Sequence, residues 1–321
     1  MKPIVYKFSD PNAPIANGTR TSLIAILKAC LVDGYGQAPA NQPPPGGWEM
    51  QFSDSGLTKA VFRSLAPGAT GHALRIDCVT SSYSYNANIS GYEAMSDLDT
   101  GLIPMFAGSA NANNFQISNS QDTTARPWLL VADDRFFTLW VWIYSTVSDF
   151  TTNFGYSPML TFGDIIPWYP NDTHACLLAV SNYGGNGLIS LNGPDVISST
   201  STANYLLNFS RDSQGVQSAY TQRLVRGGGP GAYSEPGAAG YGMPWAAGNP
   251  IIYSRQHVPD KATYSLRGWI PGLYYPCHPL AFGQLATVDP GDGKKFLSVH
   301  CGVMNSSTIC NVFIDLGDWR A

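Results

Sequence analysis

The clearest helical pattern in this chain is one short stretch near the N-terminus, and this scarcity of helix constrains the fold most. In residues 21–36, TSLIAILKACLVDGYG, apolar side chains recur at helical spacing. Thr21 or Ser22 can begin the helix, and Gly34 stands where a helix often ends. We predict a helix over about 21–33 that is apolar nearly all round and covered on both faces. The side chains expected to face a sheet are Leu23, Leu27, Cys30 and Leu31.

The composition of the remaining chain favours strands and loops over further helices. Charged residues make up 12% of the 321 residues, about half the usual share. Glutamate, a good helix former, occurs only at Glu49, Glu93 and Glu235, whereas the chain has 33 Gly and 23 Pro. We therefore predict a mainly β (α+β) fold of antiparallel, sandwich-like sheets, with one N-terminal core helix and long Gly/Pro loops.

Several apolar runs are expected to pair as hairpins. Residues 126–145 contain two β-rich runs around a turn at Asp133 and Asp134. The runs at 157–165 and 174–180 suggest a second pair, and 296–316 alternates like a C-terminal hairpin. The tryptophans inside these runs are expected in the core, and they are Trp128, Trp140 and Trp142.

The six cysteines show no disulfide framework, so free and mostly buried thiols are expected. If Asn305 and Ser306 form a two-residue turn, the C-terminal hairpin pairs Cys301 with Cys310. Such a pair stands just close enough for a disulfide. A reducing compartment favours adjacent free thiols instead.

The chain is expected to form a single β-rich domain over 1–321, with the polar stretch 107–125 as the best candidate for a weak internal boundary. The segment 227–250 is rich in Gly and Pro yet carries apolar side chains. Two interpretations remain open for it: an ordered loop on its own domain, or an arm that orders against a neighbouring subunit. The interface candidates on that arm are Tyr233, Tyr241, Met243 and Trp245.

No residue pattern indicates catalysis or a cofactor. The chain has no G-x-S-x-G, H-E-x-x-H, Walker A or G-x-G-x-x-G motif. Asp97, Asp99 and Asp164 lie near aromatic residues, which would suit a glycan hydrolase, but turn hydrogen bonds explain them more simply. We predict that the protein is not an enzyme and has no catalytic residues and no cofactor.

A metal site is not expected either. Potential ligands gather near the C-terminus, but they stand as direct neighbours instead of the spaced pairs typical of zinc sites. Neighbours on a strand point to opposite faces, so each pair could lend only one ligand. The residues concerned are Cys277, His278, His300, Cys301 and Cys310.

Charge and hydropathy exclude two classes of partner. The net charge is −4 and no Lys/Arg run occurs, so nucleic acid is not expected as a partner. The N-terminus lacks a secretory apolar stretch, and no run reaches the ~20 apolar residues of a membrane helix. A soluble protein made in a cytoplasm is the expectation.

Short motifs follow one another along most of the chain: SLIAILKACLVDGYG (22–36), GW (47–48), KAVFR (59–63), ALRIDC (73–78), GYEAMSDLDTG (91–101), TARPWLLVADDRFFTLWV (124–141), FGDI (162–165) and LRGWIPGLYYPCHPLAFGQ (266–284). Together they resemble a widespread family of uncharacterised tailed-bacteriophage virion proteins. In that family, a short strand and a helix ending in a CLVxGYG motif precede GW and AV[FY]R. The segment 227–250 matches nothing in the family pattern.

The resemblance implies a virion structural subunit and no catalytic residues. A low-charge, aromatic-rich surface agrees with burial by neighbours, although a β-rich protein with well-packed loops would show the same composition. We expect a homo-oligomer that contacts other virion proteins, placed at the head–tail neck as a connector-associated or collar protein. The alternatives are a head-surface decoration or glycan-binding module, and a particle-associated glycan hydrolase.

Overall fold

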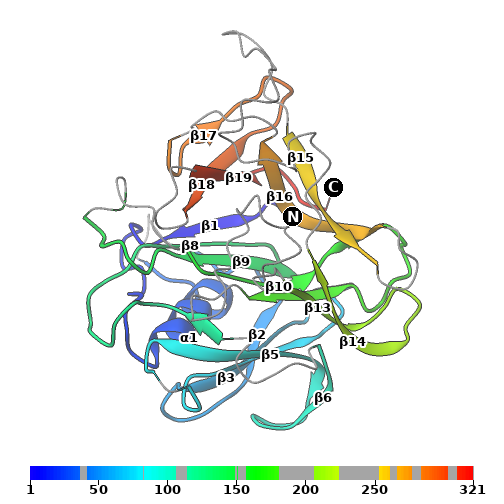
Figure 1. Ribbon diagram of the computed structural model, residues 1–321, viewed down its shortest axis with the longest axis horizontal. Coiled ribbons are helices and arrows are strands. Elements are labelled where there is room, and N and C mark those ends of the chain that lie inside the picture. Colours follow the sequence, from blue (N-terminus) through cyan, green and yellow to red (C-terminus); the bar gives the residue numbers. More distant parts are fainter. Residues whose placement is uncertain are drawn as a thin grey trace, which may run out of the picture.

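The described chain forms three antiparallel sheets stacked in layers, and one sheet lies between the other two (Figure 1). This confirms the mainly β prediction. We call the middle layer the central sheet and the others the first and second outer sheets. The computed structural model describes residues 1–36, 42–81, 83–105, 114–148, 150, 157–180, 206–223, 253–260, 266–276, 283–302 and 309–320.

The central sheet has seven strands in the order β1-β8-β9-β10-β12-β13-β14. Strands β8 and β9 pair across the turn at Asp133 and Asp134, as predicted, and β10 pairs with β12. The first strand joins from far along the chain, since Ile4 pairs with Ala132. The strands are β1 (Ile4–Lys7), β8 (Trp128–Ala132), β9 (Phe136–Val141), β10 (Met159–Asp164), β12 (Cys176–Val180), β13 (Leu206–Arg211) and β14 (Gln217–Arg223).

The first outer sheet runs in the order β2-β3-β4-β5-β6, with β7 also paired to β5. Strand β7 lies inside the polar stretch 107–125, so this part of the stretch belongs to the sheet. The strands are β2 (Trp48–Ser53), β3 (Lys59–Ser64), β4 (Ala73–Asp77), β5 (Asn86–Met95), β6 (Gly101–Pro104) and β7 (Asn114–Gln116).

The second outer sheet runs in the order β11-β16-β19-β18-β17, with β15 also paired to β16. Its β18–β19 pair is the predicted C-terminal hairpin, and the register sets Cys301 opposite Cys310. The strands are β11 (Ile166–Pro167), β15 (Tyr253–Pro259), β16 (Leu266–Pro276), β17 (Thr287–Val288), β18 (Phe296–Gly302) and β19 (Ile309–Asp315).

The central sheet is buried on both faces, which explains its continuous apolar runs. Along β8, Leu130 and Ala132 pack with the N-terminal helix and the first outer sheet. Leu129 and Val131 point the other way and pack with the second outer sheet. The three tryptophans expected in the core are all buried: Trp128, Trp140 and Trp142.

The predicted helix is present, but only its first half is α-helical. It consists of α1 (Ser22–Leu27) and a π-helix (Lys28–Asp33), and it ends at Gly34, whose φ is 75°. Thr21 is the N-cap residue, yet its side chain makes no capping hydrogen bond. Instead, Ser22 Oγ accepts from the Asn17 N–H and donates to the Ile15 carbonyl, at 2.9 Å each. The side chains expected to face a sheet are all buried: Leu23, Leu27, Cys30 and Leu31.

The turn between β8 and β9 ties the layers together. One carboxylate oxygen of Asp133 accepts the backbone N–H groups of Arg135 and Phe136, at 2.8 and 2.7 Å. The other accepts Arg320 Nε at 2.7 Å. From the first outer sheet, Trp48 Nε1 donates to the Asp133 carbonyl at 2.9 Å. The turn therefore holds residues that are far apart in the sequence.

Candidate functional site

The described residues bring one group of metal-ligand side chains together, where the first outer sheet meets the central sheet. His72 directly precedes β4, Glu93 lies in β5, and His174 lies in the turn before β12. One candidate ligand atom from each residue lies within 4.8 Å of the others. We call these three residues the His–Glu–His cluster.

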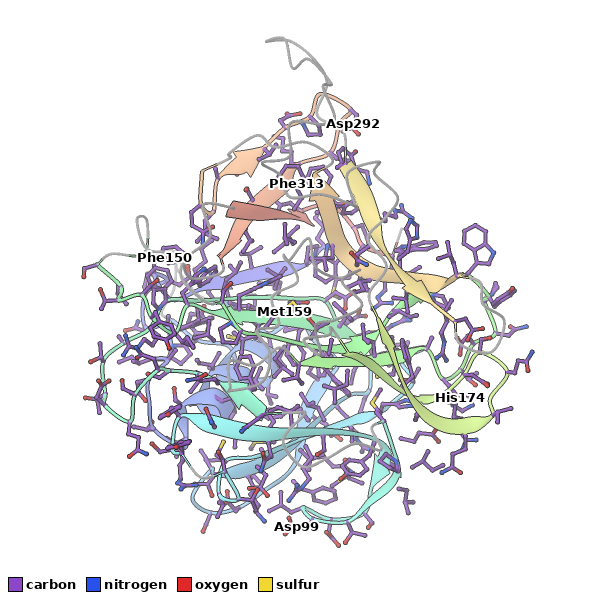
Figure 2. All side chains as sticks on the ribbon, in the orientation of Figure 1. Asp99, Phe150, Met159, His174, Asp292 and Phe313 are labelled. Carbon is purple, nitrogen blue, oxygen red and sulfur yellow. The ribbon has the colours of Figure 1, made fainter. Side chains whose placement is uncertain are left out.

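The strand register explains why two of the three residues meet. Ala73 pairs with Tyr92 in the β4–β5 ladder, so the preceding His72 falls opposite Glu93. His174 comes from the central sheet side, and its Nδ1 lies 3.8 Å from Glu93 Oε1. Figure 2 shows His174 at the side of the molecule, near the β13–β14 hairpin.

Arg211 fixes the orientation of Glu93. Its Nε donates to Glu93 Oε1 at 2.6 Å and its Nη2 to Oε2 at 3.2 Å, which is a two-point carboxylate contact. Burial works against ionisation of Glu93, but hydrogen bonds from Arg211 and Ser210 outweigh it and hold the Glu93 pKa below its ordinary value. Glu93 is therefore an oriented, ionised carboxylate at neutral pH.

His72 is buried and neutral. The residue is 5% exposed, and burial lowers the pKa of its imidazole to about 4. The Nε2 atom lies 3.2 Å from Ser210 Oγ, Nδ1 is buried without a hydrogen bond of standard geometry among the described residues, and the ring also interacts with the Thr70 backbone. In the tautomer with the proton on Nε2, the Nδ1 lone pair is available for a metal ion or a hydrogen-bond donor.

A buried ion pair supports the two segments that carry His174 and Arg211. In β16, Arg267 donates from Nε and Nη2 to the two carboxylate oxygens of Asp172, at 2.6 and 2.9 Å. Arg267 Nη1 donates to the Arg211 carbonyl at 2.8 Å, and Nη2 to the His174 carbonyl at 2.9 Å. The guanidinium is completely buried and therefore fixes both segments relative to the second outer sheet.

A separate pocket of about 510 Å³ lies on the second outer sheet. Its wall includes Trp269 and Tyr274, and the Arg255 guanidinium carbon lies 4.7 Å from the centre of the Trp269 ring. The Tyr274 hydroxyl accepts from Arg255 Nε at 3.1 Å and from Lys294 Nζ at 3.0 Å. Aromatic faces and cations therefore converge on one concave surface.

An exposed aromatic corner adjoins this pocket. Trp168 and Tyr169 follow β11 and are 62% and 47% exposed. The Trp168 ring stands edge-on to that of Trp269, with centroids 6.2 Å apart. We call Trp168 and Tyr169 the aromatic corner.

The structure describes only some of the residues singled out from the sequence. Cys301 and Cys310 are opposite each other in the β18–β19 hairpin. The arm candidates Tyr233, Tyr241, Met243 and Trp245, and the pair Cys277 and His278, lie outside the described residues. The expectation of free, buried thiols holds for Cys30, Cys78 and Cys176.

The three aspartates considered for glycan chemistry all accept hydrogen bonds from other groups of the protein, and Asp99 accepts from Lys59 Nζ at 2.9 Å. Asp97 accepts the backbone N–H groups of Asp99 and Thr100, at 2.8 and 2.7 Å. Asp164 accepts the N–H and hydroxyl of Thr70, at 2.8 and 2.6 Å. None of the three lines the pocket.

The sequence pattern did not reveal the His–Glu–His cluster. The potential ligands that are close in sequence lie between residues 277 and 310, away from all three members. The pairing of β4 with β5 was the available signal, but the connection at 78–85 is too long for a turn type to set the register. Nothing in the sequence pattern marks His174 as a ligand, because only the packing of two sheets brings it to His72 and Glu93.

No family model matches the sequence, and no curated protein matches it either. Within the described part of the chain, no helix is both long enough and apolar enough to cross a membrane.

Proposed function

We propose that this protein is a multi-copy structural subunit of a tailed-bacteriophage virion, placed at the head–tail neck as a connector-associated or collar protein. The resemblance of its motifs to a virion protein family motivates the proposal. Copies of the chain and other virion proteins are its partners, and the virion is its location.

The observation that carries the proposal is that charged residues of those motifs form contacts inside the protein. Asp133 bonds to Arg320, Asp164 to Thr70, and Arg267 to Asp172. Each of these contacts joins segments that are far apart in the chain. Motif residues employed as internal ties suit a scaffold, whereas a catalytic motif would leave polar groups facing a substrate.

The aromatic corner supports assembly. Protein interfaces are enriched in Trp and Tyr, and the corner is adjacent to the largely apolar ring of Trp269. In an assembly of identical copies, such a surface would be covered by a neighbour.

Electron microscopy of the phage particles, together with quantitative mass spectrometry, tests the proposal. We expect many copies per particle, arranged symmetrically at the neck. A Trp168→Ser/Tyr169→Ser double variant should lower incorporation at least tenfold. The control variant Leu102→Ser changes a similarly exposed apolar residue, 58% exposed on β6, and should leave incorporation unchanged. Particles that assemble without the chain in them would refute the proposal.

A second candidate function is a glycan-binding virion module, which the pocket favours. Trp269 offers a face for sugar stacking, and Arg255 and Lys294 offer positive charge for acidic groups. We expect acidic oligosaccharides to bind better than neutral ones of the same length in calorimetry. Trp269→Ala should weaken binding at least tenfold, whereas Tyr83→Ala, at an exposed tyrosine of the first outer sheet side, should not. Equal binding by both variants would exclude this pocket.

A further inference from the structure

We propose that the His–Glu–His cluster binds a divalent transition-metal ion, and that zinc suits its ligand set. Two imidazoles and one carboxylate supply two nitrogen donors and one oxygen donor, which zinc accepts. The proposal does not depend on the virion assignment.

The state of His72 supports this inference. Metal ions bind imidazole through a nitrogen lone pair, and His72 brings a buried ring to the cluster. Its Nδ1 is buried and makes no hydrogen bond of standard geometry among the described residues, an arrangement that a further ligand would improve. If Nε2–H donates to Ser210 Oγ, the hydrogen bond fixes the tautomer that leaves the Nδ1 lone pair free.

Glu93 can bind an ion while it keeps its contact with Arg211. A carboxylate offers about four lone-pair positions. Arg211 uses two of them and Ser210 a third, so one position is left for an ion. Outer-shell partners of this kind orient metal-binding carboxylates. The positive charge of Arg211 opposes the ion, so we expect micromolar affinity and not the tighter binding of an all-anionic site.

The cluster must contract slightly around an ion. Ligand atoms of a tetrahedral zinc site stand roughly 3.4 Å apart, given bond lengths of about 2.1 Å. The present spacing extends to 4.8 Å, so at least one side chain has to move by about 1 Å or more. His174 can supply this movement, because it lies in a turn and its side chain is 31% exposed.

The ion would link two layers of the fold. His72 and Glu93 belong to the first outer sheet, and His174 precedes a strand of the central sheet. A metal ion that binds only the folded state raises the apparent stability of the protein. We therefore expect zinc to increase the melting temperature of the chelator-treated protein.

The test uses the full chain, stripped with EDTA and dialysed, and titrated with Zn²⁺ by calorimetry. We expect one ion per chain to bind at the cluster with micromolar Kd, and no binding of Mg²⁺ at the same concentration. His174→Ala should weaken that binding at least tenfold, and because the side chain is partly exposed, misfolding is a minor concern. His257→Ala, which changes a histidine of β15 outside the cluster, should bind like the natural chain.

Cobalt substitution identifies the ligands. Co²⁺ bound to imidazole and carboxylate gives visible absorption without the intense near-ultraviolet band of thiolate ligands. We expect that spectrum for the natural chain and its loss in His174→Ala. Absence of saturable zinc binding, equal affinity in His174→Ala, or a thiolate spectrum retained in that variant would each overturn the proposal.

Discussion

Replacing Arg267 by methionine should lower the free energy of unfolding by about 3–5 kcal/mol in urea titrations. The side chain of Asp172 is 1% exposed, so the variant leaves a buried carboxylate without its cation. The carbonyls of Arg211 and His174 also lose donors. Methionine keeps most of the side-chain volume, so the loss reports the charge and the hydrogen bonds.

Two further variants isolate the cause of this loss. Arg63→Met removes a partly exposed pair with Glu49 and should change stability by less than about 1 kcal/mol. Combining Arg267→Met with Asp172→Leu removes both buried charges, and part of the lost stability should return. If Arg267→Met costs no more than Arg63→Met, the ion pair does not hold these segments.

Leu27→Asp should destabilise the protein by at least about 4 kcal/mol, because it places a charge inside the core between the helix and the central sheet. Leu27 is fully buried and packs among the side chains of the larger core. Leu27→Ala keeps the site apolar and should cost about 3 kcal/mol through the cavity it leaves. Thermal unfolding followed by circular dichroism measures both effects.

The neighbouring Lys28 provides the control, since its side chain is 34% exposed. Lys28→Ala should shift the free energy of unfolding by less than about 0.5 kcal/mol. A Leu27→Asp variant that stays soluble and melts like the natural chain would mean that the helix is not buried.

Much of the fold was predictable because its signals are local. The helix, the β8–β9 turn and the buried tryptophans follow from the spacing of apolar residues and from turn chemistry. The π-helix at Lys28–Asp33 did not follow, because nothing in its residue pattern distinguishes it from α-helix. The stacking of three layers also depends on contacts between distant strands, such as β1 with β8.

The candidate site was less accessible to sequence reasoning. Its donors lie at positions 72, 93 and 174, too far apart for any short motif. The strand pair brings two of them together, but the third arrives only through the packing of the sheets. The potential ligands that are close in sequence lie between residues 277 and 310 and do not include the cluster. Local spacing is the only sign of a metal site that a single sequence offers.

The Asp133–Arg320 ion pair has a consequence for folding kinetics. Its partners are 187 positions apart, and the Asp133 side chain is fully buried. During synthesis, the β8–β9 hairpin emerges long before residue 320 does. The Asp133 carboxylate therefore cannot pair with Arg320 until the end of the chain has been made. The contacts that complete the central sheet should therefore form late. Folding should be slow, as is usual for topologies dominated by pairings between distant segments.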